Sequence, residues 1–284
     1  MEFIAKYPPL LAIGNTPMVK IDADLDIGDA EIHVKYEHLN PGGSIKDRPV
    51  LRMLGEAILS GELTKEKSII DATSGNAGIA YAMIGAVLGY KVTLVMPENA
   101  SEERKKRLIA HGAEIIFTDP CWATTRRCTS DQYSNPNNPQ AHYDTTAEEI
   151  LRQAPNITHF VGGVGTGGTI SGVGRRLKEH NPDIKVISID PPEWPGVEGL
   201  KPLSAGHIIP DTFDSSVVDE MLEIDVDASY EMSHKLSAIG LFAGQSSGAY
   251  VQGAYEIARR DRSGQIVTIF NDIGERYFST GMWG

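Results

Sequence analysis

Short apolar runs alternate with helical patterns along the chain of 284 residues. Runs typical of strands occupy residues 31–36, 67–71, 91–96, 114–117, 158–161, 185–190 and 265–270. Helical patterns occupy residues 45–59, 77–88, 101–111, 170–180, 228–239 and 249–260. Because strand, helix and strand in succession form βαβ units, this alternation favours parallel sheets. We therefore predict an α/β fold of two lobes, each a mostly parallel twisted sheet flanked by helices.

A glycine-rich turn follows one predicted strand and opens the next helix, with the sequence Gly165-Thr166-Gly167-Gly168-Thr169. Backbone N–H groups at a helix N-terminus form a positive site that suits a phosphate dianion. Glycine lets the backbone approach such a ligand closely, and the two threonine hydroxyls add donors. The sequence thus predicts a phosphate-binding turn.

A second hypothesis uses the overlapping residues 163–168, which match the dinucleotide pattern G-x-G-x-x-G. Asp190 ends the next predicted strand, where such folds place the acidic residue that binds a ribose. An NAD-dependent dehydrogenase is therefore an alternative. It leaves the other polar turns of the chain without a role.

Another polar turn, Thr73-Ser74-Gly75-Asn76, also stands between a predicted strand and a predicted helix. Hydroxyls and amides at a helix N-terminus provide the donors that a substrate carboxylate needs. Simple capping of the helix by Ser or Asn uses the same chemistry. Both interpretations remain open, because a cap uses only some of the free N–H groups.

Two further loops carry reactive side chains. Residues 38–48 hold Lys46 in a loop rich in Pro and Gly, where Ser44 is placed to cap a helix beginning at Ile45. Residues 244–249 place Ser246 before another predicted helix. Taken alone, the lysine is typical of a solvated surface charge and the serine of a helix cap.

The composition narrows the possible partners and the compartment. A net charge of −12 and a pI near 5.1 argue against nucleic acid or an anionic membrane as a partner. Cys121 and Cys128 fit a reducing compartment, and their spacing is not that of a zinc site, so we expect no metal. The first residues do not form a basic and apolar leader, and the longest apolar region, 78–89, is too short to span a bilayer. We expect a cytoplasmic enzyme.

Taken together, motifs spread over nearly the whole chain resemble those of one enzyme family. They occupy residues 13–19, 40–48, 73–78, 132–139, 165–169, 196–200, 244–249 and 274–280. In this order they resemble the cysteine synthase (O-acetylserine sulfhydrylase) and cystathionine β-synthase family. These are pyridoxal-phosphate enzymes of the tryptophan-synthase-β fold (fold type II).

The resemblance implies a role for each motif. Lys46 would form the Schiff base with pyridoxal 5'-phosphate and act as general acid and base. Asn76 would bind the 3′ oxygen of the cofactor, and Ser246 would meet its pyridine nitrogen. The residues that would hold the cofactor phosphate are Gly165, Thr166, Gly167, Gly168 and Thr169. The residues that would hold the substrate α-carboxylate are Thr73, Ser74, Gly75 and Gln132.

The implied reaction is β-replacement on an O-activated L-serine, with O-acetyl-L-serine as the expected donor and sulfide as the nucleophile, giving L-cysteine. A neutral serine at the pyridine nitrogen would weaken the electron sink and favour expulsion of the β-leaving group. The alternatives in the same cofactor class are cystathionine β-synthase, an O-phosphoserine sulfhydrylase and a serine/threonine dehydratase. A remote alternative is a non-catalytic binding protein of this fold.

The family also implies a homodimer and a division into lobes. Residues 40–145 would form a smaller mobile lobe, and residues 1–39 together with 146–284 a larger lobe that binds the cofactor phosphate. Two departures stand out. Ala77 replaces the usual threonine, which removes one hydroxyl from the carboxylate site. The segment 118–131, which contains both cysteines, is shorter than in the family and too poor in helix formers for a full helix, which puts lobe closure in question.

Overall fold

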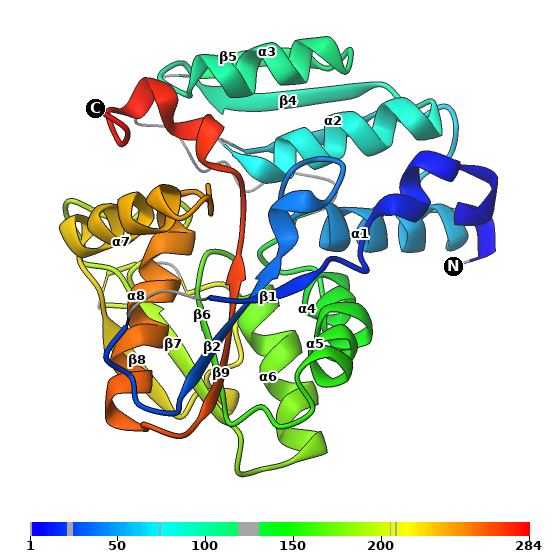
Figure 1. Ribbon diagram of the computed structural model, residues 1–284. Coiled ribbons are helices and arrows are strands. Elements are labelled where there is room, and N and C mark those ends of the chain that lie inside the picture. Colours follow the sequence, from blue (N-terminus) through cyan, green and yellow to red (C-terminus); the bar gives the residue numbers. More distant parts are fainter. Residues whose placement is uncertain (1, 22–24, 74, 119–130, 205, 208) are drawn as a thin grey trace.

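The computed structural model describes residues 2–21, 25–73, 75–118, 131–204, 206–207 and 209–284, whose strands form two separate sheets (Figure 1). The larger sheet has the spatial order β1 (Met18–Lys20), β2 (Glu31–Tyr36), β9 (Gln265–Phe270), β6 (His159–Gly163), β7 (Lys185–Asp190) and β8 (Glu220–Glu223). The smaller sheet has the order β3 (Ile69–Ala72), β4 (Val92–Pro97) and β5 (Glu114–Thr118). Every neighbouring pair is parallel except β1 with β2. The predicted α/β fold with mostly parallel sheets is confirmed.

Helices flank both sheets (Figure 1). The α-helices are α1 (Asp47–Leu59), α2 (Asn76–Leu88), α3 (Glu102–Ala110), α4 (Asn137–Ala141), α5 (Glu148–Gln153), α6 (Gly168–His180), α7 (Val226–Ala238) and α8 (Gln245–Arg260). A π-helix, His142–Ala147, joins α4 to α5. The 3-10 helices are Glu2–Lys6, Pro8–Ala12, Glu37–Leu39, Ser215–Val217 and Gly274–Thr280. The helical run from α4 to α5 and the short strands β1 and β8 were not among the expected elements.

The start of α1 corrects one expectation. Ser44 does not cap this helix, which begins at Asp47 rather than at Ile45. The backbone of Ser44 instead forms an antiparallel bridge with Asp272, and the N–H of Ile45 donates to the carbonyl of Asn271 at 2.9 Å. These pairings engage the backbone of Ser44 and Ile45 with the segment after β9, and α1 begins two residues later.

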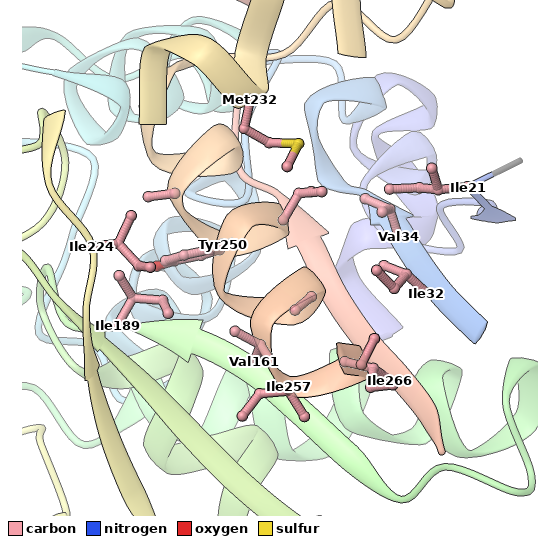
Figure 2. Packing of buried hydrophobic residues seen from close by; sticks show 14 of the residues in the cluster. Ile21, Ile32, Val34, Val161, Ile189, Ile224, Met232, Tyr250, Ile257 and Ile266 are labelled. Atoms are coloured by element: carbon pink, nitrogen blue, oxygen red, sulfur yellow. The ribbon is translucent and has the colours of Figure 1, made fainter. Parts of the chain in front are cut away.

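The central strands β6, β7 and β9 of the larger sheet are buried on both faces. Figure 2 shows α8 lying over the sheet, with Val161, Ile189 and Ile266 of the central strands close to Tyr250 and Ile257 of that helix. Helix α6 covers the opposite face, where its apolar side chains pack with those of β6, β7 and β9 in a separate cluster. A parallel sheet covered on both faces needs nearly continuous apolar strands, which explains the apolar runs in the sequence.

The smaller sheet packs with α1, α2 and α3 around its own cluster, which includes the fully buried Tyr81 and Leu94. Leu10 belongs to this cluster as well, although the sequence placed residues 1–39 with the larger lobe. Ala147 and Ile150, which the sequence placed in the larger lobe, pack in the cluster beneath α6. We therefore propose only one change to the expected lobes, that the N-terminal turns join the smaller one. The cysteines of the short segment lie outside the described residues.

No helix in the described parts of the chain is both long and apolar enough to cross a lipid bilayer.

Candidate active site

A cavity of about 710 Å³ lies between the lobes, at the carboxyl ends of the parallel strands. Open α/β sheets bind ligands in this position. Most of the residues predicted from the sequence line it, namely Lys46, Thr73, Gly75, Asn76, Gln132, Gly165, Thr166, Gly167, Thr169 and Ser246. Gly168 lies just behind this surface, as the first residue of α6. Ser74 lies outside the described residues.

Lys46 lies at the junction of the two lobes, immediately before α1. The two residues before it pair with the chain that leaves β9, so the lysine is held at the end of the central strand. Burial lowers the pKa of Lys46, while the negative charge of Asp272 opposes this effect. The pKa shift increases the neutral fraction of the amine, and only the neutral form can act as a nucleophile or accept a proton.

A buried network of charges fixes the first turn of α1. The Arg48 guanidinium donates to both oxygens of Glu37, at 2.6 and 2.7 Å, and to both oxygens of Glu149, at 2.7 and 2.8 Å. Lys35 Nζ lies 2.7 Å from Glu149 Oε2, and its side chain is fully buried. Two cations therefore balance two anions within the protein. Because these residues come from β2, its adjoining turn, α1 and α5, the network holds the Lys46 loop against the larger lobe.

The glycine-rich turn opens α6 toward the cavity. Gly167 is the N-cap and has φ of +84°, and a Cβ there would lie 2.6 Å from the Cβ of Phe213. The hydroxyl oxygen of Thr166 accepts hydrogen bonds from Asn138 Nδ2, at 3.0 Å, and from the Gly168 N–H, at 3.3 Å. Since both bonds use the lone pairs of this oxygen, its O–H remains free to donate to an anion at the turn.

His142 contacts the 165–169 turn, and the sequence analysis did not single it out. Its ring Nε2 lies 3.2 Å from Thr169 Oγ1, and its Nδ1 lies 2.9 Å from Thr146 Oγ1. Burial, reinforced by the positive charges of Arg48 and Lys46, holds the pKa of His142 well below its usual value. The ring is therefore neutral at pH 7. No motif marks it, because a lone histidine within a helical run carries no sequence signal.

Ser246 and Asn76, the two residues predicted to contact the cofactor ring, come from opposite lobes. Ser246 is the second residue of α8, and its Oγ accepts a hydrogen bond from Asn271 Nδ2 at 3.2 Å. Asn76 begins α2, and its Nδ2 donates to Asp272 Oδ2 at 2.7 Å. The sequence did not single out Asn271 or Asp272. A polar pair after a strand is typical of any turn, so the sequence held no signal for them.

The predicted carboxylate site lies at the start of α2. Gly75 is the N-cap of this helix and offers no side chain, so the first N–H groups of the helix open toward the cavity. Thr73 and Gln132 line the same cavity, and so does Ala77, where the resembled family usually has threonine. The site thus keeps amide donors and a hydroxyl for a carboxylate.

A cation that the sequence did not indicate also lines the cavity. Arg104 of α3 is buried, forms an ion pair with Glu198 of the loop after β7, and lies over the ring of Tyr277, 5.7 Å from its centroid. Because α3 belongs to the smaller lobe and Glu198 to the larger, this ion pair links the lobes across the cavity.

The donors of the cavity fit pyridoxal phosphate. A helix N-terminus with a free threonine O–H suits its phosphate, and the buried amine of Lys46 suits its aldehyde. Among the described residues, no group of three or more His, Cys, Asp or Glu side chains could hold a metal ion. Asp190, the predicted ribose ligand of the dehydrogenase hypothesis, accepts a hydrogen bond from the Leu203 N–H at 3.2 Å.

Comparison with known proteins agrees with this donor set. A family model described as "Pyridoxal-phosphate dependent enzyme" matches residues 9–272. A "Cysteine synthase" from Aquifex aeolicus is 44% identical, with 98% of this chain and 93% of that protein covered. The crystal structure of a hydrogen sulfide-producing enzyme from Fusobacterium nucleatum is similar, with a TM-score of 0.88, 38% identity, and 95% and 99% of the two chains covered. An O-acetylserine-dependent cystathionine β-synthase from Helicobacter pylori has a TM-score of 0.86, 33% identity, and 97% and 98% covered.

Proposed function

The chain belongs to the pyridoxal-phosphate-dependent enzyme family, and on that basis we propose that it makes L-cysteine from an O-activated L-serine and sulfide, with O-acetyl-L-serine as the donor. The observation that carries this proposal is the convergence of Lys46, the 165–169 turn and Ser246 on one cavity. A dehydrogenase would have no use for a lysine of lowered pKa in the cavity that this turn also lines. The family match therefore favours pyridoxal phosphate over a dinucleotide.

The cofactor, when bound, draws electron density from the substrate α-carbon and so makes its proton acidic. Lys46 Nζ is the group of this chain that would remove that proton, because burial lowers its pKa against the opposing charge of Asp272 and it lies in the cavity. Acetate would leave from the β-carbon of the donor, and sulfide would take its place there.

The remaining groups bind and orient. We assign the cofactor phosphate to the N-terminus of α6 and the hydroxyls of Thr166 and Thr169, the ring nitrogen to Ser246, and the 3′ oxygen to Asn76. We assign the substrate carboxylate to the start of α2, through Thr73, Ser74, Gly75 and Gln132. Binding the carboxylate in the smaller lobe and the phosphate in the larger lobe would draw the lobes together around the substrate.

The nucleophile has one specific alternative. The similar structure from Helicobacter pylori is an O-acetylserine-dependent cystathionine β-synthase. Homocysteine is thus a second nucleophile to compare with sulfide. Both reactions share the donor and the residues assigned above, so they differ only in what enters the cavity second.

We also propose that the enzyme is a cytoplasmic homodimer. The reasons are the family resemblance for the dimer and the acidic, cysteine-poor composition for the compartment. Sedimentation at several protein concentrations tests the dimer.

A lysine variant tests the assignment of the cofactor. Lys46→Ala protein incubated with pyridoxal phosphate should lack the yellow absorbance of the lysine-bound cofactor. Reduction with borohydride should leave no cofactor covalently attached to this variant. Lys201→Ala is the matched control, since Lys201 also lines the cavity but stacks on Tyr133, 4.0 Å from the ring centroid. An unchanged spectrum in the Lys46 variant would refute the assignment.

A substrate panel tests the reaction. O-acetylserine, O-phosphoserine and serine are each mixed with sulfide or homocysteine, and cysteine and cystathionine are quantified. We expect the highest kcat/KM for O-acetylserine with sulfide. Cofactor binding without turnover of any donor would indicate a non-catalytic binding protein.

A further inference from the structure

Two residues that immediately follow β9, Asn271 and Asp272, occupy the point where the two lobes meet. β9 lies between β2 and β6 in the larger sheet, and both residues line the cavity. Their backbone carbonyls accept the N–H of Ile45 and the N–H of Gly244, at 2.9 and 3.0 Å. The pair therefore touches both the Lys46 loop and the turn that carries Ser246.

Asn271 fixes the direction of the Ser246 hydroxyl. Asn271 Nδ2 donates to Ser246 Oγ at 3.2 Å. Its backbone N–H donates to Ser247 Oγ at 3.0 Å, which holds residue 271 against the start of α8. Because Ser246 acts as the acceptor in its bond to Asn271, its own hydrogen remains available to a ligand.

Asp272 fixes the orientation of the Asn76 amide in the same manner. Asp272 Oδ2 accepts one N–H of Asn76 at 2.7 Å and the hydroxyl of Tyr277 at 2.9 Å. On the other side, Arg276 donates to Asn76 Oδ1. The amide can therefore not flip without losing both bonds. Its second N–H is the group left over for the cavity.

We propose that Asn271 and Asp272 are positioning residues, which hold Ser246 and Asn76 as hydrogen-bond donors toward the ring of the bound cofactor. This role rests on the proposed function, since it concerns how the residues of that cofactor site are oriented. A donor at the ring nitrogen keeps that nitrogen unprotonated, since a protonated nitrogen would need an acceptor there. A donor at the 3′ oxygen favours the ionised form of that oxygen. The positive end of α8 acts in the same direction as the Ser246 donor.

The substitution Asn271→Asp tests the first half, because it keeps the size of the side chain and reverses its hydrogen bond. A carboxylate can only accept, so Ser246 would donate to residue 271 and present a lone pair to the ring. We expect a changed absorbance spectrum of the bound cofactor and a shifted pH titration of that spectrum. Asn271→Ala, which frees the hydroxyl without reversing it, should shift the titration less.

The substitution Asp272→Ala tests the second half. Freeing the Asn76 amide removes a held donor from the cofactor oxygen, so we expect the cofactor Kd to rise at least about tenfold. Asp272→Asn is the matched control, since its amide oxygen can still accept from Asn76, and it should restore most of the affinity. If Asp272 had a purely structural role, we would not expect weak cofactor binding and an altered cofactor spectrum in Asp272→Ala together with recovery of the affinity in Asp272→Asn. Thermal melting of each apoprotein shows which variants are folded, and Asp272→Ser replaces the alanine variant if that one unfolds.

The outcomes separate this proposal from the proposed function. A native protein that binds no pyridoxal phosphate would refute the proposed function itself. A native protein that binds it, with folded Asn271→Asp and Asp272→Ala variants whose spectrum, titration and cofactor Kd match the native values, would refute the positioning role alone. A shifted titration in Asn271→Asp together with weakened cofactor binding in Asp272→Ala supports it.

Discussion

Removing Arg48 should destabilise the protein far more than removing an exposed arginine from the same helix. The Arg48 side chain is 3% exposed and makes four hydrogen bonds of 2.8 Å or less to two carboxylates, Glu37 and Glu149. In Arg48→Met the size is kept, but Glu37 stays fully buried with only the neutral donors Thr16 and Asn40 in hydrogen-bonding distance. Breaking a buried pair by removing one partner costs about 3–5 kcal/mol.

The matched control is Arg52→Ala, one turn further along α1. Arg52 pairs with Glu56 and Asp144, and its side chain is 29% exposed. Surface pairs of this kind contribute at most about 1 kcal/mol. Urea unfolding of the apoproteins measures both variants, with the m-value checked for a change in the unfolded state. If Arg48→Met costs no more than Arg52→Ala, the reasoning from the buried network is wrong.

The pH dependence gives a second check on the same network. Burial raises the pKa of Glu149, but the hydrogen bonds and charges of Arg48 and then Lys35 outweigh it and hold the pKa at about 2, below its ordinary 4.5. This carboxylate therefore stabilises the native protein above pH 4.5, and its contribution is lost as the pH falls from 4.5 toward 2. The Arg48→Met variant has already lost most of this contribution of Glu149, because Arg48 is the main cause of the lowered pKa. The difference in unfolding free energy between native protein and variant should shrink over this acidic range, and a constant difference would contradict the assignment.

Two further substitutions test the cavity walls. Gly168→Ala should weaken cofactor binding at least tenfold, by roughly 1.4 kcal/mol or more, because its Cβ would lie 2.0 Å from Asn138 Oδ1 and displace the side chain that supports the 165–169 turn. In the control Gly196→Ala the new Cβ has 3.7 Å of clearance, so this variant should bind the cofactor normally. Titration of both variants with pyridoxal phosphate measures the difference. Glu198→Gln should raise KM for the amino-acid substrate and lower the melting temperature of the apoprotein, because it removes the charge that pairs with the buried Arg104 guanidinium between the lobes. Steady-state kinetics and melting curves identical to those of the native enzyme would show that this ion pair does not link the lobes.

The sequence located the strands of the larger sheet closely. The expected ranges of β2, β7 and β9 coincide with those observed, because each carries a run of β-branched and apolar residues that is bounded by polar residues. Strand β8 was missed, because only alternate residues of Glu220–Glu223 face inward and the run is too short to show a period. The start of α1 was misplaced, because a distant segment pairs with Ser44 and overrides its local preference for a helix cap.

The candidate site shows the same division. The phosphate turn could be predicted from its own residues, whereas the role of Lys46 followed only from the resemblance of the whole set of motifs, because this lysine taken alone is typical of a surface charge. His142 and Arg104 could not, because each gains its place only from the packing of a helix against another part of the chain. Local sequence records what a residue prefers, and it does not record which distant residue it will meet.

By itself, the sequence predicted parallel sheets and a helix terminus suited to phosphate, and its resemblance to a family implied a Schiff-base lysine. The tertiary structure decided how these parts meet. β9 is the last strand in the chain, yet it pairs with β2, the second, in the middle of the larger sheet. That pairing joins segments more than 200 residues apart and is decided by the burial of both sheet faces, which no local pattern encodes. It places Asn271 and Asp272 among the Lys46 loop, the Ser246 turn and Asn76, and so makes three separate motifs into one site.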